Sequence, residues 1–145
     1  MTAARQSARP AQLAGWVGQE ARSAAPVYQD GTPVTISYAA DPLADRAVLV
    51  ATDANGNTVG QEDVPLQSTA YQWLGANLAG NPLPSGSYIL RLESYREGQP
   101  ISTQGKVESY QPILEARGGA GGSTTLILRG GVEVASTEVT ALRVP

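Results

Sequence analysis

Residues 46–64 read RAVLVATDANGNTVGQEDV, and their pattern is the strongest indication of the fold class. The run from Arg46 to Thr52 is almost continuously apolar, which is typical of a strand buried on both faces. Asn55-Gly56 follows closely and supplies the positive φ angles that a tight hairpin requires. Thr58 to Val64 then provides the returning strand. We therefore expect an antiparallel hairpin here, and with it a fold built from strands.

Short strands and turn signals continue in both directions from this hairpin. Val34, Ile36 and Tyr38 alternate with polar residues, which is the period-two pattern of a half-buried strand. The strands expected from such patterns lie at 34–38, 46–52, 58–64, 69–74, 87–95, 101–115 (one strand or two, interrupted near Pro112), 124–128 and 132–144 (two short strands). Because no convincing long helix appears, the sequence predicts an all-β sandwich or small barrel.

The 145 residues include no His and no Cys, and 41% of them are hydrophobic. The length suits one ordinary domain or two small ones with a real core. The missing residue types exclude imidazole triads, Cys/His zinc sites, iron–sulfur ligation and disulfides. Only carboxylates, Lys, Arg, Tyr and hydroxyls remain for catalysis, and the carboxylates have the spacing of solvated strand faces. We expect no enzyme, no catalytic residue, no cofactor and no metal site.

The side chains carry a net charge of −3, and the ten Lys and Arg residues are scattered singly along the chain. Phosphate backbones and anionic lipid surfaces require clustered cations, so binding of nucleic acids or of such membranes is disfavoured. The longest apolar runs, such as 47–51, are too short to cross a bilayer, and we expect no membrane insertion. The N-terminus also lacks the pattern of a secretory signal.

The segment Asp53–Asn57 begins like a calcium-binding loop. Such a loop needs Gly at its sixth position and a bidentate Glu at its twelfth, where this chain has Thr58 and Val64. Because Asn-Gly is the strongest short-range hairpin signal, we interpret the segment as the turn of a hairpin.

The glycine-rich segment 118–122 is similarly open to a phosphate-loop interpretation. No Lys occupies the place that a phosphate loop requires, and a strand follows instead of a helix. A hairpin loop is therefore the better interpretation.

Three aromatic residues, Tyr71, Trp73 and Tyr88, offer two further interpretations. Tyr71 and Trp73 are two positions apart, which places both rings on one face of a strand. They could form an aromatic platform for a sugar or a peptide, but packing in the core is the commoner fate of such rings.

The order of these motifs resembles a known family, the flagellar hook-capping proteins, also called hook assembly scaffold or basal-body rod modification proteins. Each piece alone occurs in many β-proteins, whereas the ordered set extends over residues 13–145. The matching pieces are Leu13–Ala21, Asp30-Gly31, Val48–Val50 followed by Asp53–Gly56, Tyr71–Gly75, Gly80, Leu83–Tyr88, Gly105–Ser109, and Leu126–Leu128 with Gly131.

The resemblance implies a divided architecture. The family has a Tudor-like small β-barrel that is interrupted by an inserted fibronectin-type-III-like (immunoglobulin-like) β-sandwich. In this chain the barrel would be built from 14–31 and 97–145, and the insert from 32–96. Residues 1–13 would form a flexible lead-in. The N-terminal export region of the family would precede residue 1.

The resemblance also implies a function without catalysis. Members of the family form a cap at the distal end of the growing hook, where they guide the polymerisation of hook protein subunits. They leave the cell through the flagellar export apparatus without a cleaved leader and act outside it. The implied partners are hook protein subunits, together with self-association into a cap oligomer. The alternatives are a carbohydrate- or surface-binding β-sandwich module that uses Tyr71, Trp73 and Tyr88, and a residual carboxylate hydrolase.

Overall fold

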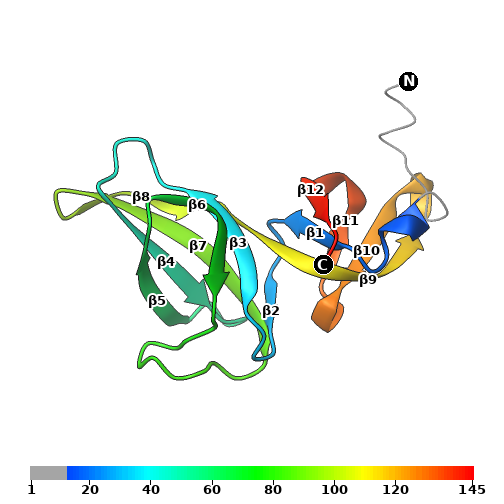
Figure 1. The fold of residues 1–145 in the computed structure, drawn as a ribbon, viewed down its shortest axis with the longest axis horizontal. Helices are drawn as coiled ribbons and strands as arrows, with labels where there is room; N and C mark the ends of the chain where they lie inside the picture. Colours follow the sequence, from blue (N-terminus) through cyan, green and yellow to red (C-terminus); the bar gives the residue numbers. More distant parts are fainter. Residues whose placement is uncertain (1–12) are drawn as a thin grey trace. The chain divides into compact units, whose positions relative to one another are not determined.

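A computed structural model describes residues 13–145 and shows an all-β chain in which all strand pairs are antiparallel (Figure 1). The described residues form two compact units. We call residues 26–109 the sandwich unit, and residues 13–25 together with 110–145 the split unit. The prediction of an all-β fold is confirmed. The predicted lead-in lies outside the described residues except for Leu13, which is buried in the core of the split unit.

The sandwich unit contains two sheets. In the first, β3 (Val34–Ala39) lies between β6 (Gln67–Trp73) and the first residues of β9 (Val107–Gly118). In the second, β4 (Arg46–Thr52) lies between β5 (Thr58–Val64) and β7 (Gly86–Arg96). The other edge of β7 pairs with β2 (Val27–Gln29) and with β8 (Gln99–Gly105).

The hairpin predicted from residues 46–64 is the β4–β5 pair, in which Ala47 lies opposite Val64. The consecutive residues Val48, Leu49 and Val50 are all buried, as expected for a strand covered on both faces. Leu49 lies on the inner face of the sheet and contributes to the core. Val48 and Val50 lie on the outer face, where Val48 is opposite Glu93 of β7 and Val50 is opposite Arg91. This strand is therefore central to the unit.

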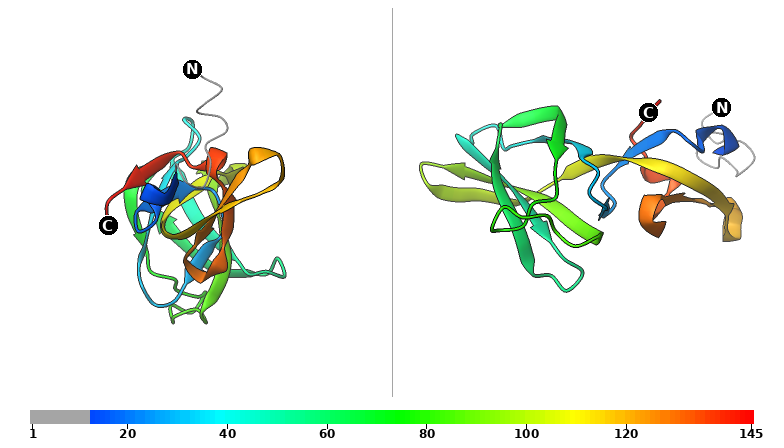
Figure 2. Two further views of the ribbon diagram at one scale, coloured as in Figure 1. Left: turned by 90° about the vertical axis from the view of Figure 1, so that its right-hand side faces the viewer. Right: turned by 60° about the horizontal axis from the view of Figure 1, so that its bottom comes forward.

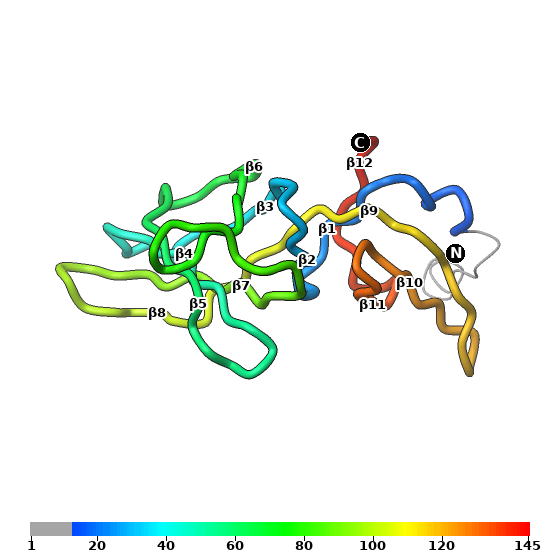
Figure 3. Tube along the Cα trace, turned by 90° about the horizontal axis from the view of Figure 1, so that it is seen from below, coloured from blue at the N-terminus to red at the C-terminus, as the bar shows by residue number. Residues whose placement is uncertain are grey.

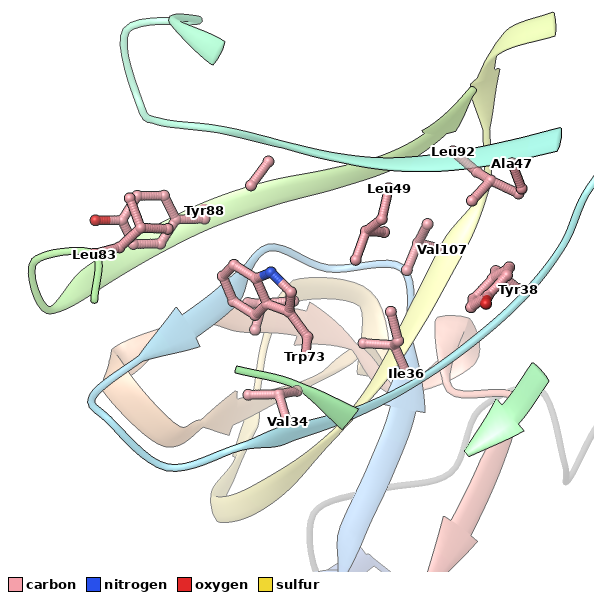
Figure 4. Packing of buried hydrophobic residues seen from close by; sticks show 12 residues of the cluster. Val34, Ile36, Tyr38, Ala47, Leu49, Trp73, Leu83, Tyr88, Leu92 and Val107 are labelled. Carbon is pink, nitrogen blue, oxygen red and sulfur yellow. The ribbon is translucent and has the colours of Figure 1, made fainter. Parts of the chain in front are cut away.

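The core of the sandwich unit is formed by inward-facing side chains of both sheets (Figure 4). Trp73 is only 1% exposed, and its ring makes an edge-to-face contact with Tyr88 at 6.2 Å between ring centroids. The Tyr88 hydroxyl donates a hydrogen bond of 2.6 Å to the carbonyl of Pro84, four residues upstream. A tyrosine that binds back to the chain before its own strand in this way is a hallmark of immunoglobulin-like sandwiches.

The split unit has one sheet with the strand order β11-β10-β9-β1-β12 (Figure 3). Its strands are β1 (Glu20–Ser23), the later part of β9, β10 (Thr124–Leu128), β11 (Glu133–Ala135) and β12 (Ala141–Arg143). The 3₁₀ turns that join or precede them are η1 (Ala14–Trp16), η2 (Ala120–Gly122), η3 (Arg129–Gly131) and η4 (Ser136–Glu138). Within the described residues, this strand order is open and does not close into a ring.

The core of the split unit is small and largely aliphatic. Its buried members are Leu13, Ala21, Ile113, Leu126, Leu128 and Val134. Trp16, from η1, is partly buried against this cluster. Residues from before and after the sandwich unit thus share one core.

The long segment 101–115 divides at a different place from the one predicted. The chain leaves one strand and enters the next at Lys106, between β8 and β9, and β9 continues through Pro112. Figure 2 shows β9 as a long continuous strand in yellow. The last pair between β9 and β10 joins Ile113 to Leu128, so Pro112 lies just beyond that ladder. Its missing N–H therefore removes no hydrogen bond with β10.

The short strands β1 and β2 have no counterpart among the individually expected strands. With four and three residues, they are too short for an alternating pattern to be distinguished from chance. Because β2 pairs with β7 and β8 also pairs with β7, both belong to the sandwich unit. The predicted joins at 31/32 and 96/97 accordingly fall inside this unit.

Candidate interaction surface

The aromatic residues considered as a sugar platform are core residues. Trp73 and Tyr88 are 1% and 6% exposed, and both belong to the core of the sandwich unit. Tyr71 is half-buried, and its hydroxyl donates a very short hydrogen bond to the carboxylate of Glu62. The interpretation of these rings as core packing is confirmed, and the carbohydrate-binding alternative loses the platform on which it depended.

The segment Asp53–Asn57 is the turn of the β4–β5 hairpin. One carboxylate oxygen of Asp53 accepts hydrogen bonds of 2.9 Å from the backbone N–H groups of Asn55 and Asn57. These N–H donors lower the pKa of Asp53, with Asn57 making the largest contribution. The carboxylate thus holds its own turn, and the hairpin interpretation is confirmed.

The loop Asn77–Asn81 has the same hydrogen-bonding pattern. The Asn77 side-chain oxygen accepts 2.9 Å hydrogen bonds from the N–H groups of Ala79 and Asn81. In both loops the N–H of the first residue donates to the carbonyl of the fifth, and the N–H of the glycine donates to the carbonyl of the first. The shared sequence, Asp or Asn followed three residues later by Gly-Asn, therefore builds the same structural turn twice.

The glycine-rich segment 118–122 joins the antiparallel strands β9 and β10, which confirms the hairpin interpretation. Among residues 13–145, no three His, Cys, Asp or Glu side chains are grouped closely enough to hold a metal ion. The same residues contain no helix with the length and apolar character needed to span a bilayer.

The sandwich unit has a shallow, open groove of about 670 Å³ over its first sheet. It extends across β6, β3 and the segment that leads into β9. The lining residues are Ser37, Tyr38, Ala39, Gln67, Ser68, Thr69, Lys106 and Glu108.

The groove follows from the sizes of side chains on neighbouring strands. Ser37 and Ala39 lie two positions apart on β3 and therefore share one face of the sheet. Ser37 lies opposite Glu108, and Ala39 lies opposite Gln67. Small side chains on the central strand, flanked by long ones on its neighbours, leave a hollow along β3.

The groove is polar, and its charges are balanced. The Lys106 ammonium lies 3.7 Å from the Glu108 carboxylate, and the remaining lining side chains are mostly hydroxyls and an amide. Lys106 is well exposed, whereas the side chain of Glu108 is 13% exposed. These groups can form hydrogen bonds with a polar chain, but they do not form a set of catalytic acids and bases.

Beneath this groove, Tyr38 belongs to the core. Tyr38 is 6% exposed, and its ring meets Tyr71 edge to face at 6.1 Å between centroids. Burial, with a smaller contribution from the Glu62 carboxylate, raises the pKa of Tyr38 to about 12. The tyrosine is therefore a neutral packing residue at physiological pH.

Charge is distributed unevenly between the two units. The sandwich unit has nine carboxylate side chains and four basic ones, which gives a net side-chain charge of −5. The described residues of the split unit have four of each and are neutral. The sandwich unit is therefore acidic as a whole, although the charges within its groove are balanced.

The split unit has a cluster of cations around one aromatic ring. The guanidinium of Arg143 lies 4.2 Å from the centroid of the Tyr110 ring, and that of Arg22 lies 6.0 Å from it. Arg143 also binds the carboxylate of Glu20, which lies opposite it in the β1–β12 pair. We call Glu20, Arg22, Tyr110 and Arg143 the arginine–tyrosine cluster.

Sequence reasoning named no residue of the groove or of the arginine–tyrosine cluster as a site. Ser37, Thr69 and Glu108 have the spacing of ordinary strand residues, and nothing local marks them. The members of the cluster come from β1, β9 and β12, so only strand pairing brings them together. The absence of charge along Gln67–Trp73 is the one local feature that sets β6 apart, and it does not show by itself that the strand lies at a sheet edge.

Comparison with known proteins identifies relatives for most of the chain. Residues 23–98 match the family model of the FlgD Ig-like domain. The crystal structure of FlgD from Xanthomonas campestris, described as giving insights into the hook capping essential for flagellar assembly, is 26% identical with a TM-score of 0.69. That alignment covers 91% of this chain and 96% of the other.

A second solved structure, FlgD from P. aeruginosa, is 21% identical and shows the same fold with a TM-score of 0.63. It covers 88% of this chain, and 97% of the P. aeruginosa chain is covered in turn. No curated protein matches the sequence.

Proposed function

The chain belongs to the FlgD family of flagellar hook-capping proteins, and from this premise we propose that it guides the polymerisation of hook protein subunits at the distal end of the growing hook. The family is one of non-enzymatic scaffolds. The observation that carries the proposal is the match of residues 23–98 to the FlgD Ig-like domain, extended by a similar structure over 91% of the chain.

The residues of the chain support a role that depends on surface complementarity. The groove over β6, β3 and β9 contains hydroxyls, an amide and one ion pair, which suit hydrogen bonding to another chain. The arginine–tyrosine cluster combines two of the three residue types, Tyr and Arg, that are enriched among the residues with large binding energy at protein interfaces. Most of these residues lie on paired strands, which suits a scaffold that presents its surface from a sheet.

Partners and location are part of the same proposal. Its partners are hook protein subunits, together with further copies of this chain in a cap oligomer. The protein leaves the cell through the flagellar export apparatus and acts outside it. The absence of cysteine means that its stability outside the cell does not depend on disulfides.

The architecture of the family is proposed for the two units as well. The sandwich unit corresponds to the inserted fibronectin-type-III-like domain, and the split unit corresponds to the Tudor-like module. The hydrogen bond from the Tyr88 hydroxyl to the Pro84 carbonyl supports the first assignment. A crystal structure would test the assignment of the split unit. In a Tudor-like barrel the sheet closes, so its edge strands β11 and β12 should lie close to each other. A flat, open sheet would contradict the assignment.

Deletion of the gene in the bacterium that encodes this chain tests the proposed function. We expect basal bodies without hooks and free hook subunits in the medium, since exported subunits would lack a guide for polymerisation. Restoring the gene should restore hooks, which electron microscopy of isolated basal bodies would count. Normal hooks of normal number in the deletion strain would overturn the proposal.

A further inference from the structure

The free edge of β6 is the least protected sheet edge of the sandwich unit. In the described residues, β6 pairs with β3 alone. An unpaired edge offers a row of backbone donors and acceptors, and proteins normally guard it with charge, proline or short length. The strand β6, Gln67–Trp73, contains neither a charged residue nor a proline.

Other edge strands of the described chain have such guards. Glu62 and Asp63 lie on β5, and Pro100 lies on β8. The edge strands β2 of the sandwich unit and β11 and β12 of the split unit have only three residues each. The open edge of β6 is therefore an exception within this molecule.

The direction of the backbone groups along β6 can be inferred from its register. The N–H of Ala40 donates to the carbonyl of Leu66, just before β6, and Tyr38 then lies opposite Ser68. Because backbone groups alternate between the two sides of a strand, those of the intervening residue Gln67 turn towards the open edge. The register then shifts between Ser68 and Tyr71, so Thr69 and Ala70 form a bulge opposite Ser37.

The bulge leaves one exposed position suited to binding. The Ala70 N–H is already satisfied by the Ser68 hydroxyl at 3.2 Å. Thr69 is exposed and, like Gln67 and Ser68, lines the groove. The groove thus reaches the open edge of β6. A strand added at this edge would lie about 5 Å from β6. Long side chains of such a strand would extend over the small residues of β3.

Two features of the sandwich unit define the occupant. A row of backbone groups with a polar groove beside it fits an extended segment that binds by strand addition, in which the main chain supplies affinity and side chains supply specificity. A net side-chain charge of −5 favours a segment with basic side chains and repels a second copy of the same unit.

We propose that the open edge of β6 takes up an extended segment of a hook subunit as an added strand, with uncharged residues beside Gln67–Thr69 and Lys or Arg among its longer side chains. This inference rests on the proposed function, from which the identity of the partner comes. It adds the place of contact and its chemistry.

Binding of the full chain to purified, immobilised hook subunits of the same bacterium tests the inference. The Ser68 carbonyl turns towards β3, so the N–H of Thr69, on the opposite side of the same trans peptide, faces the open edge. We expect Thr69→Pro, which removes this N–H, to weaken binding about tenfold. Thr69→Val, which keeps the N–H, should bind like the wild type. The matched control is Thr103→Pro, because Thr103 is also an exposed threonine beside a register shift on an edge strand, β8. It should leave the affinity unchanged.

Hydrogen exchange of the wild-type protein gives a second measurement that does not depend on any variant folding. Amides of residues 67–72 should become protected when hook subunits are added, whereas those of 99–105 should not. Raising the salt concentration should weaken binding, since an acidic unit would be meeting a basic segment.

The outcomes separate the two proposals. Binding that Thr69→Pro and Thr103→Pro weaken equally, or protection away from residues 67–72, would overturn the strand-addition inference and leave the proposed function standing. Absence of any binding to hook subunits would count against both. A concentration-dependent dimer of this chain that Thr69→Pro abolishes would assign the edge to a second copy and would also overturn the inference.

Discussion

The sandwich unit and the split unit are both antiparallel, but different interactions hold them. The sandwich unit places a buried tryptophan and tyrosines between two sheets. The split unit has one sheet, a smaller aliphatic core, and cations packed on Tyr110. Large aromatic rings bury much more surface than aliphatic side chains, so the sandwich unit has more stability concentrated in single residues.

The two units also differ in net charge and in how their sheet edges are protected. The acidic sandwich unit has an unguarded strand edge, whereas the neutral split unit ends its sheet in three-residue strands. A long uncharged edge on an acidic unit favours association with a basic partner over self-association. The difference indicates that the two units contribute different surfaces, and substitutions in each unit can test it.

Replacement of Trp73 should have the largest effect. Trp73→Ala opens a cavity in the middle of the sandwich core, and we expect a loss of about 3–5 kcal/mol in the free energy of unfolding. Urea denaturation followed by circular dichroism measures it. The neighbouring Leu74 is 65% exposed, so Leu74→Ala should change stability by less than about 0.5 kcal/mol. Equal effects would mean that Trp73 is not the centre of the core.

Replacement of Leu126 tests the smaller core in the same way. Leu126 is completely buried in the split unit, and Leu126→Ala should cost about 2–4 kcal/mol. Because Trp16 packs on the same cluster, its fluorescence in a Trp73→Phe background reports the loss. Leu114, 56% exposed on β9, provides the matched control Leu114→Ala. A larger cost at Leu126 than at Trp73 would reverse the comparison.

Removal of the Tyr88 hydroxyl should have an intermediate effect. Tyr88→Phe deletes the hydrogen bond to the Pro84 carbonyl but keeps the ring against Trp73, and we expect a loss of about 1–2 kcal/mol. Thermal unfolding of both proteins measures the difference. Tyr95→Phe is the control, because the Tyr95 hydroxyl binds Glu93 on the outer face and should contribute less. If Tyr88→Phe leaves the stability unchanged, the Tyr88 hydroxyl does not contribute to the stability of this fold.

Truncation of Arg143 tests how far the arginine–tyrosine cluster stabilises the split unit. Arg143→Ala removes both the contact with Tyr110 and the ion pair with Glu20, and we expect a loss of about 0.5–1 kcal/mol. Arg143→Lys should recover only part of it, since an ammonium stacks less well on a ring. Urea denaturation at low and high salt checks both, and a loss independent of salt would assign the effect to stacking alone.

The smallest effect concerns the two matching turns and depends on pH. A carboxylate whose pKa is lowered in the folded state stabilises the protein above its ordinary pKa of 3.8, and this contribution disappears as the pH falls through the lowered value. Asp53→Asn keeps the acceptor for Asn55 and Asn57 but does not titrate. We therefore expect similar stability at neutral pH and a weaker loss in acid.

Asn77→Asp provides the reciprocal variant. It places a carboxylate opposite the N–H groups of Ala79 and Asn81, so it should add an acid-dependent loss that the wild-type loop lacks. Thermal unfolding between about pH 3 and pH 7 compares the proteins across the range in which a carboxyl group titrates. An Asp53→Asn protein with unchanged acid sensitivity would show that this turn does not contribute to it.

Local signals predicted several of the turns and longer strands. Asn55-Gly56 and the apolar run before it indicated the β4–β5 hairpin, because their information lies within a few residues. The strands β1 and β2 escaped prediction because a strand of three or four residues carries too little pattern. The strand break predicted near Pro112 was wrong, because β9 continues through this residue. A proline interrupts a strand pair only where its missing N–H would face the partner strand, and only the pairing of the strands shows where that is.

The fold class, the main turns and the absence of imidazole and thiol chemistry follow from the amino-acid sequence, since each depends on residue type or on neighbours along the chain. Tertiary structure alone decided which aromatic rings are buried, where the groove lies and which edge is left open. Those properties depend on contacts between strands far apart in the chain. The open edge of β6 is the plainest case: its residues lack charge, but only the pairing of the strands shows that they lie at an edge.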